Sequence, residues 1–196
     1  MKNKKFSLRE EYKSSWSYVS ESKKFIYFVI FLFLFFAIIG FFLPAPDFLS
    51  KYILNYLKDL IEQTKNFSHF DWIDFIFFNN LQSSFFSMVF GVIFGIFPFF
   101  GAIFNGYLLG FVGSISVTEG GFFVLWRILP HGIFELPAIF ISLGLGLRLG
   151  TFVFQKKKEK SFKKLFLNSF KVFFYIILPL LITAAIIEGT LIFFAG

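Results

Sequence analysis

Residues 120–154 read GGFFVLWRILPHGIFELPAIFISLGLGLRLGTFVF, an apolar stretch interrupted by a few polar and helix-breaking residues. A helix needs about 20 apolar residues to cross a hydrocarbon layer roughly 30 Å thick, so this stretch can span a membrane. Pro130 and Gly132 flank His131 near its middle, and proline interrupts a helix because it lacks a backbone N–H. The sequence therefore predicts, within 121–154, a membrane helix that is broken at Pro130 and Gly132.

Apolar composition extends over the whole chain. Its 196 residues are 57% hydrophobic and 24% aromatic, and its mean hydropathy is +0.74. Three further apolar segments cover residues 25–43, 85–113 and 172–195. We therefore expect an all-α, polytopic membrane helical bundle in which residues 25–196 form one membrane domain. The same composition excludes a globular cytosolic enzyme.

Two basic segments set the expected topology. Residues 1–24 carry seven Lys and Arg against three Glu, a net charge of +4, and residues 155–171 carry seven Lys against one Glu, a net charge of +6. Basic segments that flank membrane helices stay in the cytoplasm. The sequence thus predicts a cytoplasmic N-terminal tail, 1–24, and a cytoplasmic basic loop, 155–171.

The segment between the first two apolar stretches, residues 47–80, has mixed polarity. Apolar residues recur there at helical spacing opposite a charged face. The apolar positions are Leu49, Ile53, Tyr56, Leu57, Leu60 and Ile61, and the charged ones are Lys51, Lys58, Asp59 and Glu62. This pattern predicts an amphipathic extracytoplasmic helix that lies in the lipid interface or caps the bundle.

Placing both basic segments in the cytoplasm requires an even number of crossings between them. Only three apolar stretches lie there, namely 25–43, 85–113 and 121–154. One of the two longer stretches must then enter and leave the membrane on the same side, as a broken or re-entrant central helix. We favour a turn at residues 130–132, and residues 98–101, which also contain proline and glycine, are the alternative.

Four polar side chains fall inside the apolar stretches. His131 and Glu135 are four residues apart and would share one face of a helix. Glu188 lies among small residues that let another helix approach, and Asn105 lies in the second stretch. Because an ionised group in the membrane is costly, we expect an intramembrane polar centre of Asn105, His131, Glu135 and Glu188 that faces the protein interior. It is either a functional centre or a hydrogen-bonded cluster that fixes the broken helix.

The remaining cations are expected at the membrane surface. Arg148 ends its apolar stretch, and Lys156, Lys157 and Lys158 follow it. Long cationic side chains extend to lipid headgroups, so the lipid bilayer is the expected partner of these four residues and nucleic acid is not. The pairs Gly91/Gly95, Gly106/Gly110 and Gly146/Gly150 permit close helix contact, either inside one chain or in a homo-oligomer or with other membrane proteins.

Enzymatic templates fit the sequence poorly. The chain has no cysteine and two histidines, and no H-E-x-x-H motif surrounds His131, so we expect no metal and no cofactor. If the protein were an enzyme, His131, Glu135 and Glu188 would activate a water molecule, as in the intramembrane glutamate proteases. The paired glutamates of those proteases are missing here, so an activity other than catalysis is favoured.

Several motifs resemble those of a known family. The sequence LPHGIFELPA at 129–138, followed by GLGLRLG at 144–150, is similar to the stage II sporulation protein M family of bacterial and archaeal integral membrane proteins. Further similarities are Asn79-Asn80, Asn105-Gly106 with Gly110, and AAIIE at 184–188. The resemblance covers roughly residues 25–195.

The resemblance implies a place and a role for the protein. It implies a multi-pass protein of a prokaryotic cell membrane with a cytoplasmic N-terminus. In sporulating bacteria the namesake resembles a membrane scaffold that holds peptidoglycan-degrading partners, which implies a scaffold or a subunit of a membrane complex. The alternatives are a transporter or channel for a small ion or lipid, with Glu135 and Glu188 as protonatable groups, and an intramembrane hydrolase. A hydrated cavity at the two glutamates would favour transport, and a dry, packed pair would favour the scaffold.

Overall fold

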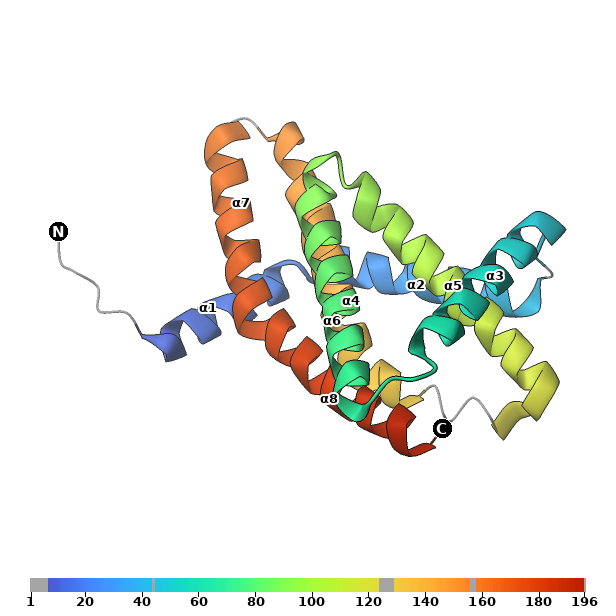
Figure 1. The fold of residues 1–196 in the computed structure, drawn as a ribbon. Helices are drawn as coiled ribbons and strands as arrows, with labels where there is room; N and C mark the ends of the chain where they lie inside the picture. Colours follow the sequence, from blue (N-terminus) through green and yellow to red (C-terminus); the bar gives the residue numbers. More distant parts are fainter. Residues whose placement is uncertain (1–6, 44, 124–128, 156–157, 196) are drawn as a thin grey trace.

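The computed structural model describes residues 7–43, 45–123, 129–155 and 158–195, without the side chains of 129–133, 158 and 195. These residues are helical almost throughout, and no strand occurs among them, so the all-α prediction is confirmed (Figure 1). The elements are α1 (Leu8–Glu21), α2 (Lys23–Phe42), α3 (Asp47–Thr64), α4 (His69–Val89) with the 3-10 turn η1 (Phe90–Val92), α5 (Ile96–Gly120), α6 (Leu129–Gly150) with the 3-10 turn η3 (Thr151–Phe154), α7 (Lys158–Val172), the π-helical turn η4 (Phe173–Ile177) and α8 (Leu178–Ala195).

Five helical stretches are long and apolar enough to cross a membrane, which makes this a multi-pass membrane protein. They are Lys23–Phe42, His69–Val92, Ile96–Gly120, Phe134–Phe154 and Glu159–Phe194. Four of them lie between the two basic segments. An even number of crossings is therefore available without a re-entrant helix. The cytoplasmic orientation of the N-terminus stays a prediction.

The expected amphipathic segment 47–80 is divided into two helices. Ser68 and Asp71 form a capping box, in which the Ser68 Oγ accepts from the Asp71 N–H at 3.3 Å and the Asp71 carboxylate accepts from the Ser68 N–H at 2.8 Å. Such a cap satisfies two backbone donors and starts a helix. It starts α4 at His69, so the apolar and charged positions of the predicted pattern all lie in α3, and α4 continues into the apolar stretch.

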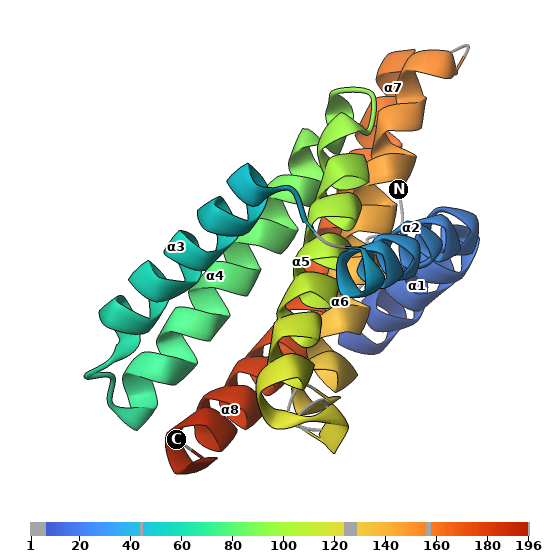
Figure 2. The same cartoon turned by 90° about the vertical axis from the view of Figure 1, so that its right-hand side faces the viewer.

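The apolar stretch 85–113 is likewise divided, by a turn at residues 93–95. Phe94 and Gly95 have positive φ angles of 53° and 72°, and α5 starts just after them. In Figure 2, α4 and α5 diverge from this turn. Pro98 lies in the first turn of α5, where backbone N–H groups lack helical partners and proline is tolerated. The alternative turning point at residues 98–101 is therefore helical.

The predicted break at Pro130 and Gly132 also falls inside a helix. Both residues lie in the first turn of α6, which begins at Leu129 and continues through Pro137. The preceding helix, α5, ends at Gly120, and residues 124–128 lie outside the described residues. Proline fits the first turn of a helix because its missing N–H has no partner there. These residues therefore help to start α6 and do not interrupt it.

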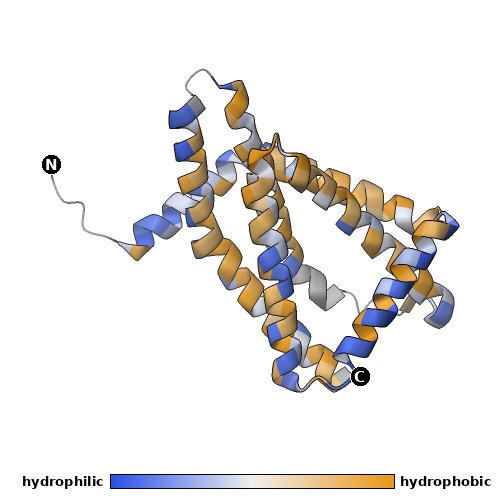
Figure 3. Cartoon of the chain, turned by 45° about the horizontal axis from the view of Figure 1, so that its top comes forward, coloured by the Kyte–Doolittle hydropathy of each residue, from blue (hydrophilic) through white to orange (hydrophobic). Residues whose placement is uncertain are grey.

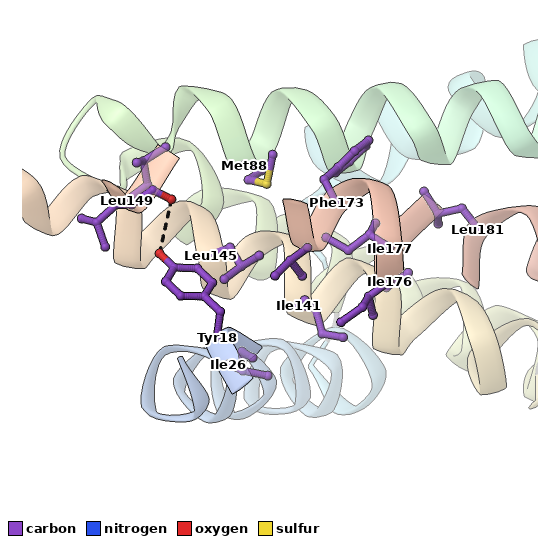
Figure 4. Packing of buried hydrophobic residues seen from close by; sticks show 13 residues of the cluster. Tyr18, Ile26, Met88, Ile141, Leu145, Leu149, Phe173, Ile176, Ile177 and Leu181 are labelled. Carbon is purple, nitrogen blue, oxygen red and sulfur yellow. Dashed lines mark hydrogen bonds between the residues drawn. The ribbon is translucent and has the colours of Figure 1, made fainter. Parts of the chain in front are cut away.

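Helix α6 lies at the centre of the bundle and is packed closely through glycine. A Cβ on Gly91 would collide with the backbone at Gly146, and a Cβ on Gly150 would collide with the backbone at Gly95. A Cβ on Gly146 would collide with the carbonyl oxygen of Ser87. The pairs Gly91/Gly95 and Gly146/Gly150 thus pack against each other inside one chain. The apolar core beside this contact includes Leu145, which is fully buried (Figure 4).

The predicted basic loop 155–171 is largely helical. From Lys158 it forms α7, which continues through η4 into α8, and the helical stretch from Glu159 to Phe194 has 36 residues. At about 1.5 Å per residue this is roughly 54 Å, longer than a bilayer core. Apolar and small residues at helical spacing pack α7 onto the bundle: Phe162, Leu165, Phe166, Ser169 and Phe170. The lysines whose side chains the structure describes lie at exposed positions of this helix, which is why charge alone predicted a loop.

Candidate functional site

Glu188 lies in the interior of the bundle. Its side chain, on α8, is 8% exposed, and the neighbouring Ala184 and Ala185 are also buried. A Cβ added to Gly189 would lie 2.7 Å from Ile73 Cγ1 and 2.9 Å from the Ile73 backbone nitrogen. The backbones of α8 and α4 therefore touch beside Glu188, and this carboxyl group lies in a closely packed environment.

Glu135 and His131 lie near the start of α6. Helices α6 and α8 run in opposite directions (Figure 1), so Glu135 and Glu188 lie toward the same end of this helix pair. Glu135 is partly buried. The His131 side chain lies outside the described residues, so its pairing with Glu135 stays a prediction.

Asn105 does not join a buried cluster. It is exposed on α5, and its Nδ2 donates to the carbonyl oxygen of Gly101, one turn back, at 2.8 Å. The neighbouring residues Gly106 and Gly110 face α2, where a Cβ would collide with the backbone at Phe33 and Ala37. This contact fixes the rotation of α5 and directs Asn105 away from α2. Asn105 thus lies on the outer surface, whereas Glu188 is buried.

Arg148, which was expected to reach the lipid headgroups, contacts the end of α1 instead. Its guanidinium donates to Ser22 Oγ at 2.7 Å and to the Tyr18 carbonyl oxygen at 3.3 Å, and it pairs with Glu21 at 3.1 Å. It also lies 4.1 Å from the centre of the Tyr18 ring. The last carbonyls of a helix lack partners and attract cations, so Arg148 holds the C-terminus of α1. We call Tyr18, Glu21, Ser22 and Arg148 the Arg148 cluster.

Tyr18 extends the Arg148 cluster to α7. Its hydroxyl donates to the Leu165 carbonyl oxygen at 3.3 Å (Figure 4). Burial raises the pKa of the Tyr18 hydroxyl above its usual value, while the Ser169 hydroxyl and Arg148 oppose the rise. Tyr18 thus connects α1, α6 and α7 through one buried phenol. The sequence suggested no such role, because Tyr18 lies in a segment that was predicted to be a tail.

Helices α1 and α7 also contact each other directly. Lys171 Nζ lies 2.6 Å from Glu11 Oε2, and Ser15 and Ser169 are almost fully buried. Small serines allow two helix backbones to approach. Of the expected headgroup lysines, Lys156 and Lys157 lie outside the described residues, as does the side chain of Lys158.

Two further polar contacts tie the spans together. The Ser142 hydroxyl on α6 donates to the carbonyl oxygen of Ser84 on α4, and both serines are buried. At the other end of α4, His69 Nε2 lies 2.9 Å from Thr190 Oγ1 on α8. Among the described residues, no three His, Asp or Glu side chains are placed to hold a metal ion.

Comparison with known proteins identifies relatives. The sequence profile of the family described as Stage II sporulation protein M matches residues 29–191. The chain is 36% identical over 115 residues to "Uncharacterized protein MJ0793" of Methanocaldococcus jannaschii, an alignment that covers 56% of this chain and 65% of that protein. The match thus spans slightly less than two thirds of the relative's length. No solved structure matches the chain. Because the profile match covers most of the sequence, this chain belongs to the stage II sporulation protein M family.

Proposed function

We propose that this protein is a scaffold subunit of a membrane complex and that helices α1 and α7 carry its partner-binding surface. One observation carries the proposal. Helices α1 and α7 pack on each other, and Arg148 fixes the end of α1 to α6. A scaffold needs a surface of fixed shape that is coupled to its membrane helices. The Arg148 cluster supplies that coupling.

The exposed face of α1 carries the anchors expected of a binding surface. Leu8, Tyr12 and Trp16 follow one another at four-residue spacing and are 65%, 50% and 44% exposed. The Tyr12 and Trp16 rings pack edge to face at 6.3 Å. Exposed aromatic side chains in a row favour binding to a partner or to the membrane interface. Figure 3 shows hydrophilic residues on α1 and α7.

Exposed lysines make α7 basic, whereas α1, over Leu8–Glu21, carries two basic against three acidic side chains. Lys13, Lys160, Lys163 and Lys164 are exposed on the two helices. Positive charge on α7 favours an acidic partner segment and accelerates its association. The proposed partner surface is therefore an acidic, amphipathic segment of another protein of the complex.

The surroundings of the buried glutamate favour this role over transport. A carrier that uses Glu135 and Glu188 needs a hydrated path to them. Two surface hollows, of about 260 Å³ and 450 Å³, are lined by residues other than these glutamates. Glu188 itself lies beside a backbone contact between α8 and α4. The packing at Glu188 supports a structural role for its carboxyl group.

Site-specific photo-cross-linking tests the proposal. A benzoylphenylalanine at Trp16 or at Lys164 should give one discrete protein adduct in native membranes. The same probe at Phe31, which is 62% exposed on the membrane helix α2, is the matched control and should not give that adduct. The partner identified in the adduct should bind the purified protein, and replacing both Tyr12 and Trp16 by Ala should weaken binding by about tenfold or more.

A second measurement addresses the transport alternative. Proteoliposomes of the wild-type protein and of Glu188→Gln should show the same proton and cation flux if Glu188 is structural. Two results together would overturn the scaffold proposal in favour of a carrier. The wild-type flux would be lost in Glu188→Gln, and the photo-cross-linker at Trp16 would react only with lipid, as it does at Phe31.

A further inference from the structure

Helix α4 carries an exposed polar stripe inside a stretch that is long enough to cross the membrane. Its mean hydropathy of 1.2 is the lowest of the five candidate spans, whose other values run from 1.6 to 2.9. Asn79, Gln82 and Ser83 are exposed, and Ser87 is partly exposed. We call these four residues the α4 stripe. Figure 3 shows the hydrophilic colour part-way along α4.

The α4 stripe lines a hollow between α4 and α5. This hollow has a volume of about 450 Å³, and its other walls are the rings of Phe86, Phe90 and Phe97. It lies next to the turn at residues 93–95, from which the two helices diverge (Figures 1 and 2). The hollow is thus polar along α4 and aromatic near the turn.

The depth of the α4 stripe makes it costly to leave in lipid. Gln82 lies thirteen residues after His69, the first residue of the span, which is about 20 Å along a helix with a rise of roughly 1.5 Å per residue. The span has 24 residues, so Gln82 lies near its middle. Hydrocarbon cannot satisfy the donors and acceptors of a carboxamide. A polar group must therefore cover the stripe in the membrane.

The chemistry of the hollow points to one occupant. None of its seven lining residues is charged, so neither a lipid phosphate nor a charged peptide finds an opposite charge there. Carboxamides and hydroxyls both donate and accept, and each of them can therefore bond to a copy of itself. We propose that the α4 stripe is the interface with a second copy of this chain.

The membrane fixes the geometry of this dimer. All copies insert with the same orientation, so the two-fold axis must lie along the membrane normal, and the two α4 helices run parallel. Residues on the axis then meet their own counterparts, Gln82 facing Gln82 and Ser83 facing Ser83. A buried amide pair at the centre of two parallel helices also fixes their register. The glycine pairs do not serve this interface, because they pack inside the chain.

Disulfide cross-linking tests the dimer cleanly, since the native chain has no cysteine. Gln82→Cys and Ser83→Cys, oxidised in membranes, should each give a covalent dimer whose yield stays constant when expression is lowered. Phe31→Cys on α2, with an exposure of 62%, is the matched control and should give only a collisional yield that falls with expression. A yield at residues 82 and 83 that equals this control would overturn the proposal.

A second variant tests whether the polar side chains of the α4 stripe hold the dimer together, or whether the two helices are merely near each other. Asn79→Leu combined with Gln82→Leu, in the Ser83→Cys background, should reduce the dimer to the control level while helix content is retained. Native mass measurement in mild detergent supplies an independent readout. A wild-type protein that is measured as a monomer with bound phospholipid, and a leucine variant that gives the same mass, would contradict the second-copy interface. Neither outcome depends on the α1 and α7 surface, so the adduct expected at Trp16 is unaffected.

Discussion

Helix α5 makes contacts of two opposite kinds. Against α2 it packs backbone to backbone, because Gly106 and Gly110 leave no space for a side chain. Away from the turn at residues 93–95 it diverges from α4, and the hollow between them is lined by polar side chains of α4 and by phenylalanine rings. The contrast teaches that glycine marks where this bundle closes on itself, and that exposed amides mark where it is open. The predictions below test this division, from the largest expected effect to the smallest.

The direct backbone contact between α2 and α5 should be essential for the stability of the fold. Gly110→Leu places a side chain against the backbone at Ala37 and Phe41, neither of which can move without separating the helices. We expect a loss of about 3 kcal/mol or more in the free energy of unfolding, at or above the usual range for overpacking. The measurement is the midpoint of unfolding in mixed micelles of increasing SDS content.

A matched control on the same helix isolates the backbone contact. At Gly101 an added Cβ would meet a side-chain atom, Leu143 Cδ2, at 3.1 Å. Because Leu143 can adjust, Gly101→Ala should cost less than about 1 kcal/mol. Equal losses for Gly110→Leu and Gly101→Ala would show that α2 and α5 are not held by a glycine contact.

The Arg148 cluster closes the opposite end of the molecule by polar contacts. Arg148→Met keeps most of the side-chain volume but leaves the Ser22 hydroxyl and the Tyr18 carbonyl without their charged donor. We expect a loss of about 1.5 to 3 kcal/mol, the range for hydrogen bonds to charged groups. Limited proteolysis should then cut within α1.

A matched variant separates the Arg148 cluster from the surface ion pair of the same two helices. Lys171→Met breaks the ion pair with Glu11. The side chain of Lys171 is 44% exposed and that of Glu11 is 27% exposed. Exposed ion pairs contribute about 1 kcal/mol or less, so this variant should leave α1 protected from protease. Cleavage of α1 in Lys171→Met, but not in Arg148→Met, would contradict the proposed coupling through Arg148.

Tyr18 gives the Arg148 cluster a dependence on pH. Burial raises the pKa of its hydroxyl in the folded protein, so the folded state holds this proton more tightly than the unfolded state. Below the ordinary tyrosine pKa of about 10 the stabilisation is complete, and it declines as the pH rises past this value. Tyr18→Phe should remove this part of the alkaline decline and cost about 1 kcal/mol at neutral pH for the lost hydrogen bond.

Unfolding midpoints between pH 8 and pH 11 measure this effect. Tyr12→Phe is the control, because Tyr12 lies on the same helix and is 50% exposed. If Tyr18→Phe and Tyr12→Phe change the pH dependence of the unfolding midpoint equally, folding does not protect the Tyr18 hydroxyl from ionisation.

Much of the fold could be predicted from sequence, and the errors share one origin. The segments 25–43 and 172–195 are helical because they are uniformly apolar or nearly so. The boundaries that sequence missed depend on short polar signals inside apolar or charged surroundings. Ser68 and Asp71 start α4. Two residues with positive φ angles, Phe94 and Gly95, follow α4 and η1 and separate them from α5. Both signals are local, and the capping box in particular can be recognised from sequence.

The candidate site was harder to predict because it depends on helix rotation and on distant partners. Glu188 lies in the interior, where small neighbours allow close packing. Asn105 shares the apolar surroundings of Glu188 in sequence, but Gly106 and Gly110 turn it outward. Arg148 finds its partners more than 120 residues away in α1. No pattern within the segment around Arg148 indicates that contact.

The open, polar side of α4 should respond least to substitution, so it tests most sharply whether this side of the bundle is open. Gln82 is exposed in the single chain, so Gln82→Leu removes no contact within it. We expect a change within about 0.5 kcal/mol in the unfolding of the monomer, as for other surface positions. The same variant should weaken the dimer, because it removes the central amide of the α4 stripe.

Measuring the unfolding midpoint at several protein-to-lipid ratios separates the effect on the monomer from the effect on the dimer. The wild-type midpoint should rise with protein concentration, and that of Gln82→Leu should stay constant. A large loss at all ratios would mean that Gln82 stabilises the single chain and that the α4 side is closed.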